Sequence, residues 1–318
     1  MPDFFIVGHA KSGTTALYEM LRHHPQIYMS QPKEPWFFAR ENPNPQASGA
    51  RSMTFTGRKS ETLAEYLSLF AAARPDQRLG EASSSYLWSH TAPERIASLR
   101  PDARIVAVFR EPASFLRSLH LQLLSAHEET EKSFRKALEL EGARREDRHL
   151  PRYAYWPQTL MYADRVRYVE QLQRYRDVFP QEQLLVLIYD DFRADNEATV
   201  RRLMRFLEVD DTQPVRVVEA NPTIGVRSVW LDELRRSLRA GRGPALRTLR
   251  YVGKALTTYR LRKALYYPLM RRTVYSQPPA ADTELMLELR RRFKPEVISL
   301  GEYLDRDLVK LWGYDSIG

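Results

Sequence analysis

Cysteine is absent from this chain of 318 residues, and long apolar runs are absent as well. Without cysteine there is no disulfide bond, no thiol nucleophile, and no zinc or iron–sulfur site with cysteine ligands. The longest apolar runs, Ile105–Phe109 and Leu184–Tyr189, have the length of a strand, whereas a membrane-spanning helix needs about 20 apolar residues. Met1–Gly13 lacks the basic start and long apolar core of a secretory signal. A cytoplasmic protein is therefore expected.

Acidic residues are scarce in one part of the chain only. The net charge of the whole chain is +9, yet Pro222–Pro279 holds thirteen Lys and Arg residues against Asp232 and Glu233, a local charge of +11. The remaining residues together carry −2. Leucine and tyrosine recur between the basic residues, which predicts helices with an apolar stripe and a basic face. We therefore expect one domain over residues 1–318, in which 222–279 is a basic, mainly helical insert or lid.

Three interpretations of this insert stay open. It forms part of a lid over an apolar or acidic acceptor, it rests on an anionic membrane surface, or its charges are an ordinary solvated face. The second interpretation would place the protein peripherally at a membrane. Nucleic acid is not expected as a partner, since no nucleic-acid reader motif accompanies the charge.

Short runs rich in β-branched and aromatic residues alternate with segments of helical period. Each run is followed by turn residues and then by such a segment, which is typical of an α/β fold with a parallel sheet. The stretches 41–59 and 139–157 predict a loop and a loop or lid, respectively. The predicted strands are Phe4–Val7, Leu79–Ala82, Arg104–Phe109 and Leu184–Tyr189, and the predicted helices are Thr14–His23, Ala113–Ala126 and Thr199–Leu207.

The first predicted strand runs into Gly8–Thr15, of sequence GHAKSGTT, and then into a helix. This arrangement aims backbone N–H groups and the positive end of the helix dipole at an anion. Lys11 would add a point charge, while Ser12, Thr14 and Thr15 would add hydroxyl donors. The segment therefore predicts a phosphate site.

A second basic position follows another predicted strand. Arg110 comes directly after Ile105–Phe109, and Ser118 lies eight residues later on the following helix. Ligands of open α/β sheets bind at the carboxyl ends of strands, so these two residues predict a second phosphate site. Nucleoside triphosphatases use GxxxxGK[ST], whereas here Lys11 precedes Gly13 by two positions. Two phosphate sites without that pattern predict a nucleotide phosphorylated at both ends.

Six segments match, in order, the motifs of one enzyme family: FFIVGHAKSGTTAL with HHP, KEPWFF, GEASSSYL, RIVAVFREPASFLRS, LLVLIYDDF, and LRRRFKPEVISLGEYLDRDLVKLWGY. Together they resemble the sulfotransferases that use 3′-phosphoadenosine 5′-phosphosulfate (PAPS), most of all the branch containing heparan sulfate sulfotransferases and bacterial relatives. The resemblance covers residues 3–210 and 283–314. It implies a three-layer α/β/α fold with a central parallel sheet and a P-loop-like phosphate site, PAPS as donor, 3′-phosphoadenosine 5′-phosphate (PAP) as product, and no required metal.

The resemblance also implies roles for the loop after the first strand. Lys11 would contact the 5′-phosphate and the oxygen that bridges it to sulfur, with Ser12, Gly13, Thr14 and Thr15 around the same phosphate. An ammonium group there stabilises the charge that builds on the departing phosphate during in-line transfer of the sulfuryl group.

Four further residues match positions that bind the donor in the family. Arg110 and Ser118 would hold the 3′-phosphate, for which the planar fork of arginine is better suited than lysine. Tyr189 would contact the adenine. Arg227 falls where family members close a loop over the 3′-phosphate.

The acceptor must lose a proton as it attacks, so a base is needed. Glu34 occupies the place of a catalytic glutamate in the resembling branch, with Lys33 beside it as an electrostatic helper. Histidine is the alternative base, and His90 and His120 are its candidates. His9 lies inside the phosphate loop and would touch the ligand without titrating.

One departure from the family concerns the acceptor. The heparan sulfate branch has Lys directly after the counterpart of Glu81, where this chain has Ala82, which argues against a glycosaminoglycan. Ser83–Ser85 and Tyr86 would instead line the acceptor side. A small-molecule, natural-product, lipid or carbohydrate hydroxyl is the expected acceptor, and an amine is less favoured. The alternatives are a P-loop kinase or NTPase and a non-catalytic nucleotide-binding adaptor at a membrane surface.

Overall fold

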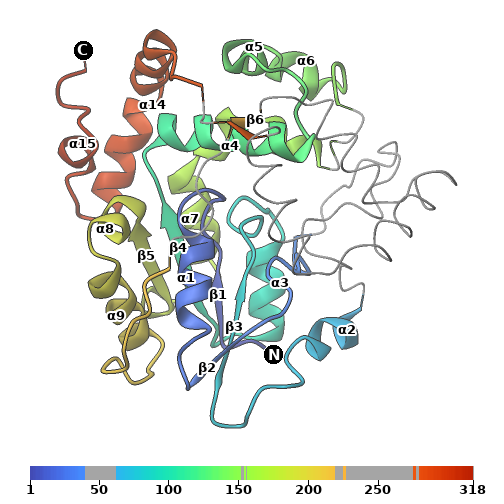
Figure 1. Cartoon of the computed structure of the whole chain (residues 1–318), viewed down its shortest axis with the longest axis vertical. Helices are drawn as coiled ribbons and strands as arrows, with labels where there is room; N and C mark the ends of the chain where they lie inside the picture. The colour runs from blue at the N-terminus through green and yellow to red at the C-terminus, as the bar shows by residue number, and fades with distance from the viewer. Residues whose placement is uncertain are drawn as a thin grey trace, which may run out of the picture.

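The computed structural model describes residues 1–39, 62–151, 154, 156–218, 225–226, 275–276 and 279–317. Within these ranges a five-stranded parallel sheet has the strand order β2-β3-β1-β4-β5 (Figure 1). Its strands are β1 (Phe4–Ile6), β2 (Ile27–Met29), β3 (Arg78–Ala82), β4 (Arg104–Phe109) and β5 (Leu184–Ile188). The chain leaves β1 towards one edge and later returns to its other side, so a topological switch point lies between β1 and β4.

Helices cover both faces of this sheet, because its central strands bury side chains on both sides. Phe4 and Ile6 pack into one core, while Phe5 and Val7 pack into the other. The first core includes α1 (Thr14–Leu21), α8 (Tyr189–Ala194) and α9 (Asn196–Phe206). The second core includes α2 (Leu63–Ser68), α3 (Ala92–Leu99), α4 (Pro112–Ala126), α7 (Tyr168–Arg176) and α14 (Thr283–Tyr303). The expected three-layer α/β/α fold is confirmed.

The predicted strands and the three predicted helices match observed elements to within a few residues. No range was predicted for the strand β2 or for the other helices of the described residues. Tyr189 begins α8 instead of ending β5. The helices α5 (Phe134–Glu139), α6 (Glu141–Arg145) and α15 (Leu308–Leu311) complete the α-helices of the described ranges, which also hold three short 3₁₀ helices at Pro157–Leu160, Ala163–Val166 and Gln181–Gln183.

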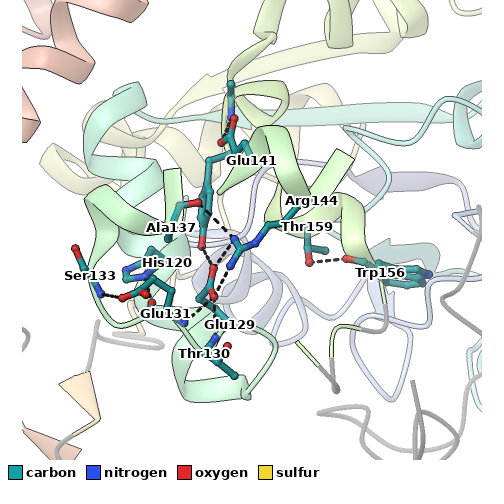
Figure 2. A network of polar contacts seen from close by, with 12 residues as sticks. His120, Glu129, Thr130, Glu131, Ser133, Ala137, Glu141, Arg144, Trp156 and Thr159 are labelled. Carbon is teal, nitrogen blue, oxygen red and sulfur yellow. Dashed lines mark hydrogen bonds and ion pairs between the residues drawn. The ribbon is translucent and has the colours of Figure 1, made fainter. Parts of the chain in front are cut away.

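The prediction of a loop or lid over 139–157 is wrong in its first half, where α6 carries a buried arginine. Arg144 donates to both carboxylate oxygens of Glu129, at 2.7 and 2.8 Å (Figure 2), and Tyr162 donates to the same carboxylate at 3.0 Å. Burial alone would raise the pKa of Glu129, but the hydrogen bonds from Arg144 and from the Thr130 and Glu131 amides, together with the Arg144 charge, hold it below its usual value. The Glu129–Arg144 ion pair is therefore part of the protein core, where each of the two charges is neutralised by the other.

Trp156 and Thr159 lie on the segment after α6. The Thr159 hydroxyl donates to the Trp156 carbonyl at 2.7 Å (Figure 2). Both residues are buried, so this part of the segment also belongs to the packed structure.

The predicted loop over 41–59 lies outside the described residues, and so does most of the basic insert, 222–279. Two short strands of the insert are described, β6 (Gly225–Val226) and β7 (Tyr275–Ser276), and they pair antiparallel. The strand β6 also packs against α4. The two ends of the insert therefore meet beside α4.

Candidate active site

The loop between β1 and α1 follows the central strand of the sheet. The His9 amide donates to the Val108 carbonyl at 3.2 Å, which ties the start of the loop to β4. A Cβ on Gly8 would lie 2.6 Å from Cβ of Val108, so only glycine allows this approach. Lys11 and Gly13 have positive φ angles of 65° and 87°, and α1 begins directly after Gly13. The loop is thus wound tightly around the helix N-terminus.

Side chains of this loop divide by exposure. Ser12 and Thr14 are buried, whereas Lys11, Gly13 and Thr15 are half-buried. A Cβ on Gly13 would lie 2.9 Å from Phe192 and 3.2 Å from Tyr189 of α8, so this glycine lets α1 and α8 meet. The loop and Tyr189, which were predicted to share one ligand, are therefore adjacent.

Arg110 joins the loop to β4. Its Nη1 donates to the Lys11 carbonyl at 2.9 Å, and its guanidinium lies 4.8 Å from the centre of the Tyr189 ring. The Tyr168 hydroxyl donates to the Arg110 carbonyl at 3.0 Å. Arg110 forms no ion pair with any residue in the described ranges. Burial, and then the nearby Arg110 charge, lower the pKa of Lys11. Two cations thus lie together at the switch point, where an anion would stabilise both.

The two other residues predicted to bind the 3′-phosphate are Ser118 and Arg227. Ser118 is buried on α4, two turns beyond the N-terminus of that helix. Arg227 lies outside the described residues. Gly225–Val226, directly before it, pack against α4.

Glu34 lies at the carboxyl end of β3, where five hydrogen bonds hold it. Its amide donates to the Ala82 carbonyl at 3.1 Å. Its Oε2 accepts from Trp36 Nε1 at 2.6 Å, from the Ser84 amide at 2.9 Å and from the Ser84 hydroxyl at 3.3 Å, while Oε1 accepts from Lys33 Nζ at 2.5 Å. The Glu34 side chain is 16% exposed. Oε2 is therefore saturated, and Oε1 is the oxygen with room for another donor.

Trp36, which donates to this carboxylate, belongs to a cluster of three tryptophan rings with Trp156 and Trp88. The ring centres of Trp36 and Trp156 are 4.9 Å apart, and those of Trp88 and Trp156 are 6.3 Å apart. The buried Arg165 guanidinium lies 4.1 Å from the centre of the Trp88 ring. Trp36 lies in the KEPWFF motif, and the loop 153–156 was expected near the acceptor, but the sequence did not show that the three rings meet, because they come from three distant segments.

The histidines singled out in the sequence, His9, His120 and His90, occupy three different environments. His9 is fully buried against Phe115, with ring centres 4.5 Å apart, and burial followed by the Arg165 charge lowers its pKa well below 6.5. Burial likewise lowers the pKa of His120, whose Nε2 lies 2.9 Å from the Glu131 carbonyl (Figure 2). His90 is exposed at the end of the SSSYLWS segment.

Three residues expected on the acceptor side, Ser83, Ser85 and Tyr86, are buried instead. Ser83 and Tyr86 are buried, and their hydroxyl oxygens accept from the backbone amides of Trp36 and Phe38 at 3.2 Å. They support the Glu34 segment, so the expectation that they line the acceptor side is wrong. Ser84 contacts Glu34 directly.

Comparison with known proteins identifies the chain. A family model described as the sulfotransferase family matches residues 2–213. The chain belongs to the sulfotransferase family. A solved sulfotransferase from Alicyclobacillus acidocaldarius is 31% identical, with a TM-score of 0.59, over 79% of this chain and 96% of that one. The resemblance inferred from the motifs is confirmed.

Curated relatives of this sulfotransferase are longer proteins. Carbohydrate sulfotransferase 15 of Mus musculus is 27% identical over 252 residues, which is 66% of this chain and 44% of the relative. Bifunctional heparan sulfate N-deacetylase/N-sulfotransferase 3 of Homo sapiens is 28% identical over 218 residues, 66% of this chain and 22% of the relative. The chain therefore spans less than half the length of these relatives.

Neither a metal site nor a membrane span is found in the described residues of the sulfotransferase. Among them, no group of three or more His, Asp or Glu side chains is placed to hold a metal ion. No helix in the same ranges is long and apolar enough to cross a membrane.

The C-terminal segment of the sulfotransferase contacts residues that follow β4 and β5, next to the donor-site candidates Arg110 and Tyr189. Tyr314 donates to Glu111, whose carboxylate caps α4 directly after Arg110 by accepting from the Ala113 and Ser114 amides. The Trp312 indole donates to Asp190 at 2.8 Å. Arg306 forms an ion pair with Asp191. Asp190 and Asp191, which follow Tyr189, are therefore structural anchors.

Glu81, the buried carboxyl group on β3, predicts a pH dependence of stability. Burial is the main reason that the pKa of Glu81 rises from 4.5 to about 7. Between these values the folded protein keeps a proton that the unfolded chain has released. The resulting stabilisation, about 3 kcal/mol, is fully present below pH ~4.5 and is lost as the pH rises through ~7.

Glu81→Gln should remove this dependence, because the amide does not titrate. Chemical denaturation of parent and variant at several pH values would measure it. The free energy of unfolding of the parent should fall relative to the variant between pH ~4.5 and ~7. A constant difference over that window would contradict the raised pKa.

Proposed function

We propose that this sulfotransferase moves the sulfuryl group of PAPS in line to a hydroxyl, and less readily to an amine, of a carbohydrate-type acceptor. The observation that carries the proposal is the meeting of Lys11 and Arg110 at the switch point, with the Glu34 carboxylate fixed at the end of the neighbouring strand. The names of its curated relatives support a carbohydrate acceptor. Small-molecule and lipid acceptors belong in the test panel.

The residues at the switch point fit a donor with two phosphates. The loop offers Lys11 and hydroxyl side chains around the N-terminus of α1, whose first N–H groups point out of the helix. Arg110 is held flat by the Lys11 carbonyl and the Tyr189 ring, which leaves the far edge of its fork for a phosphate. Tyr189 offers an aromatic face near the same place. PAPS, when bound, supplies a sulfuryl group on a phosphate leaving group.

Two residues carry the chemistry in this proposal. The acceptor oxygen forms its bond to sulfur as the bond from sulfur to the 5′-phosphate oxygen breaks. Glu34 takes the acceptor proton on Oε1, the oxygen with room for another donor. Lys11 stabilises the negative charge that develops on the departing phosphate. The partly buried site strengthens that interaction, since the local dielectric constant is below that of water.

Titration calorimetry with PAP and with Mg-ATP tests the donor, and transfer of radiolabelled sulfate from PAPS tests the reaction. PAP should bind the parent more tightly than Mg-ATP. Sulfate should pass to at least one member of a panel that includes desulfated heparan oligosaccharides, simple glycosides, phenols and lipids. Preference for Mg-ATP would favour a kinase or NTPase, and absence of transfer to every member would favour a non-catalytic adaptor.

Arg110→Lys should raise the Kd for PAP by about tenfold or more. Lysine keeps the charge but loses the planar fork, the bond to the Lys11 carbonyl and the stacking on Tyr189. Calorimetry with PAP measures the change. Arg148→Lys, at an exposed position, is the control and should bind PAP as the parent does. Equal affinity of Arg110→Lys and the parent would remove Arg110 from the phosphate site.

A further inference from the structure

Glu81 is a buried carboxyl group for which the proposed reaction has no use. It is fully buried near the end of β3. Its Oε1 accepts from the Ser83 hydroxyl at 2.6 Å, and its Oε2 accepts from the Tyr66 hydroxyl of α2. No cation of the described residues pairs with it. A carboxyl group buried without a cation is costly, so its contacts call for an explanation.

A chain of hydrogen bonds leads from Glu81 to Glu34. Ser83, which donates to Glu81, accepts from the Trp36 amide at 3.2 Å. The Trp36 indole donates to Glu34 Oε2 at 2.6 Å. Because the Ser83 proton is committed to Glu81, the lone pairs of the Ser83 oxygen face the Trp36 amide.

The backbone that this chain supports is strained. Glu34 and Trp36 both have positive φ angles, of 62° and 55°, on either side of Pro35. Each costs about 1–2 kcal/mol for a residue other than glycine, so the segment keeps this shape only where neighbouring groups hold it. The Glu34 amide is held by Ala82 and the Trp36 amide by Ser83, which both follow Glu81 on the chain.

We propose that Glu81 is a positioning residue for Glu34: through Ser83 and Trp36 it holds the strained segment that presents Glu34 Oε1 to the acceptor. The proposal rests on the assignment of Glu34 as the base. In this proposal Glu81 has no part in donor binding, because its hydrogen bonds go to Tyr66 and Ser83 and not to Lys11 or Arg110. Loss of Glu81 should therefore impair transfer and leave donor binding intact.

Glu81→Leu and Ser83→Ala test the chain at two points. Each should lower kcat by about 10- to 100-fold, measured with the carbohydrate of the panel that the parent sulfates fastest, and each should bind PAP with the parent Kd. Glu81→Gln keeps an acceptor for the Ser83 hydroxyl, so it should lose less than Glu81→Leu. Ser98→Ala, on the exposed side of α3, is the control for Ser83→Ala. Unchanged kcat in both test variants would overturn the proposal.

A double-mutant cycle with Glu34→Gln separates positioning from a general loss of structure. If Glu81 acts through Glu34, Glu81→Leu should lower kcat no further once Glu34 is Gln. A full additional loss would overturn the proposal. Ser83→Ala in the same cycle gives the answer if Glu81→Leu does not fold.

Nuclear magnetic resonance gives a readout that does not depend on transfer. The chain has five tryptophans, so the indole N–H signal of Trp36 can be assigned with Trp36→Phe. Ser83→Ala should move this signal, because the Trp36 amide loses its acceptor, and Ser98→Ala should not. An unmoved signal would overturn the proposed link. If Glu34→Gln transfers as fast as the parent, the base assignment fails, and this signal still decides whether the chain from Glu81 reaches Trp36.

Discussion

Glu34→Gln is expected to lower kcat for sulfate transfer by about 10²- to 10⁴-fold, the usual contribution of a positioned general base. Glutamine keeps the size of the side chain, and its Oε1 or its amide group can still meet Ser84 or Lys33 in part. It has no basic oxygen to take the acceptor proton. Transfer of radiolabelled sulfate from PAPS measures the change, and calorimetry with PAP should give the parent affinity.

The matched control is Glu182→Gln, an exposed glutamate beyond α7, which should transfer at the parent rate. A parent rate for Glu34→Gln would remove Glu34 from the reaction. His90 would then be the remaining candidate of the sequence, because His9 and His120 are buried with lowered pKa values. His90→Gln tested in parallel makes that outcome informative.

Lys11→Met is expected to lower kcat by about 10²- to 10³-fold, as loss of one preorganised group that stabilises developing charge usually does. Methionine has a similar length and no charge. The Lys11 carbonyl, which accepts from Arg110, is a backbone group and is kept. The loss should therefore fall on the transition state more than on the loop, and it should exceed the change in the Kd for PAP.

Lys136→Met, at an exposed position on α5, is the control for Lys11→Met and should leave kcat and PAP binding unchanged. Equal losses in PAP affinity and in kcat/KM would mean that Lys11 only binds the donor. Parent kinetics would exclude Lys11 from both roles.

Four of the five strands were predicted from the sequence, because the strands of a parallel sheet are buried on both faces, whereas of the helices only α1, α4 and α9 were given ranges. An apolar run such as that within Arg104–Phe109 is typical of a central strand of a parallel sheet. The strand β2 and the burial of Arg144 were not predicted. The strand β2 is three residues long, and Arg144 is buried only because Glu129, 15 positions earlier, meets it with both carboxylate oxygens.

The surroundings of Glu34 were harder to predict from the sequence than the loop around Lys11. Lys11 and the loop around it form a continuous motif, so their grouping follows from local geometry. Glu34 depends on Ser84, 50 residues away, and on Trp36, whose ring meets Trp156 across the fold. Ser83 was expected to face the acceptor, but strand register turns its hydroxyl inward to Glu81. One face of a strand end cannot be told from the other without the partner strand.

The sequence by itself determined a chain without thiol chemistry, a parallel α/β core, a glycine-containing loop that leads from the first strand into a helix, and a charge of +11 confined to 222–279. These properties depend on residue type and short spacing. The tertiary structure alone decided that Arg110 braces Lys11, that the second oxygen of Glu34 is saturated while the first is open, and that Glu81 lies behind both Ser83 and Trp36. Those contacts depend on the strand order, which places the carboxyl ends of β3, β1 and β4 next to one another at the same edge of the sheet.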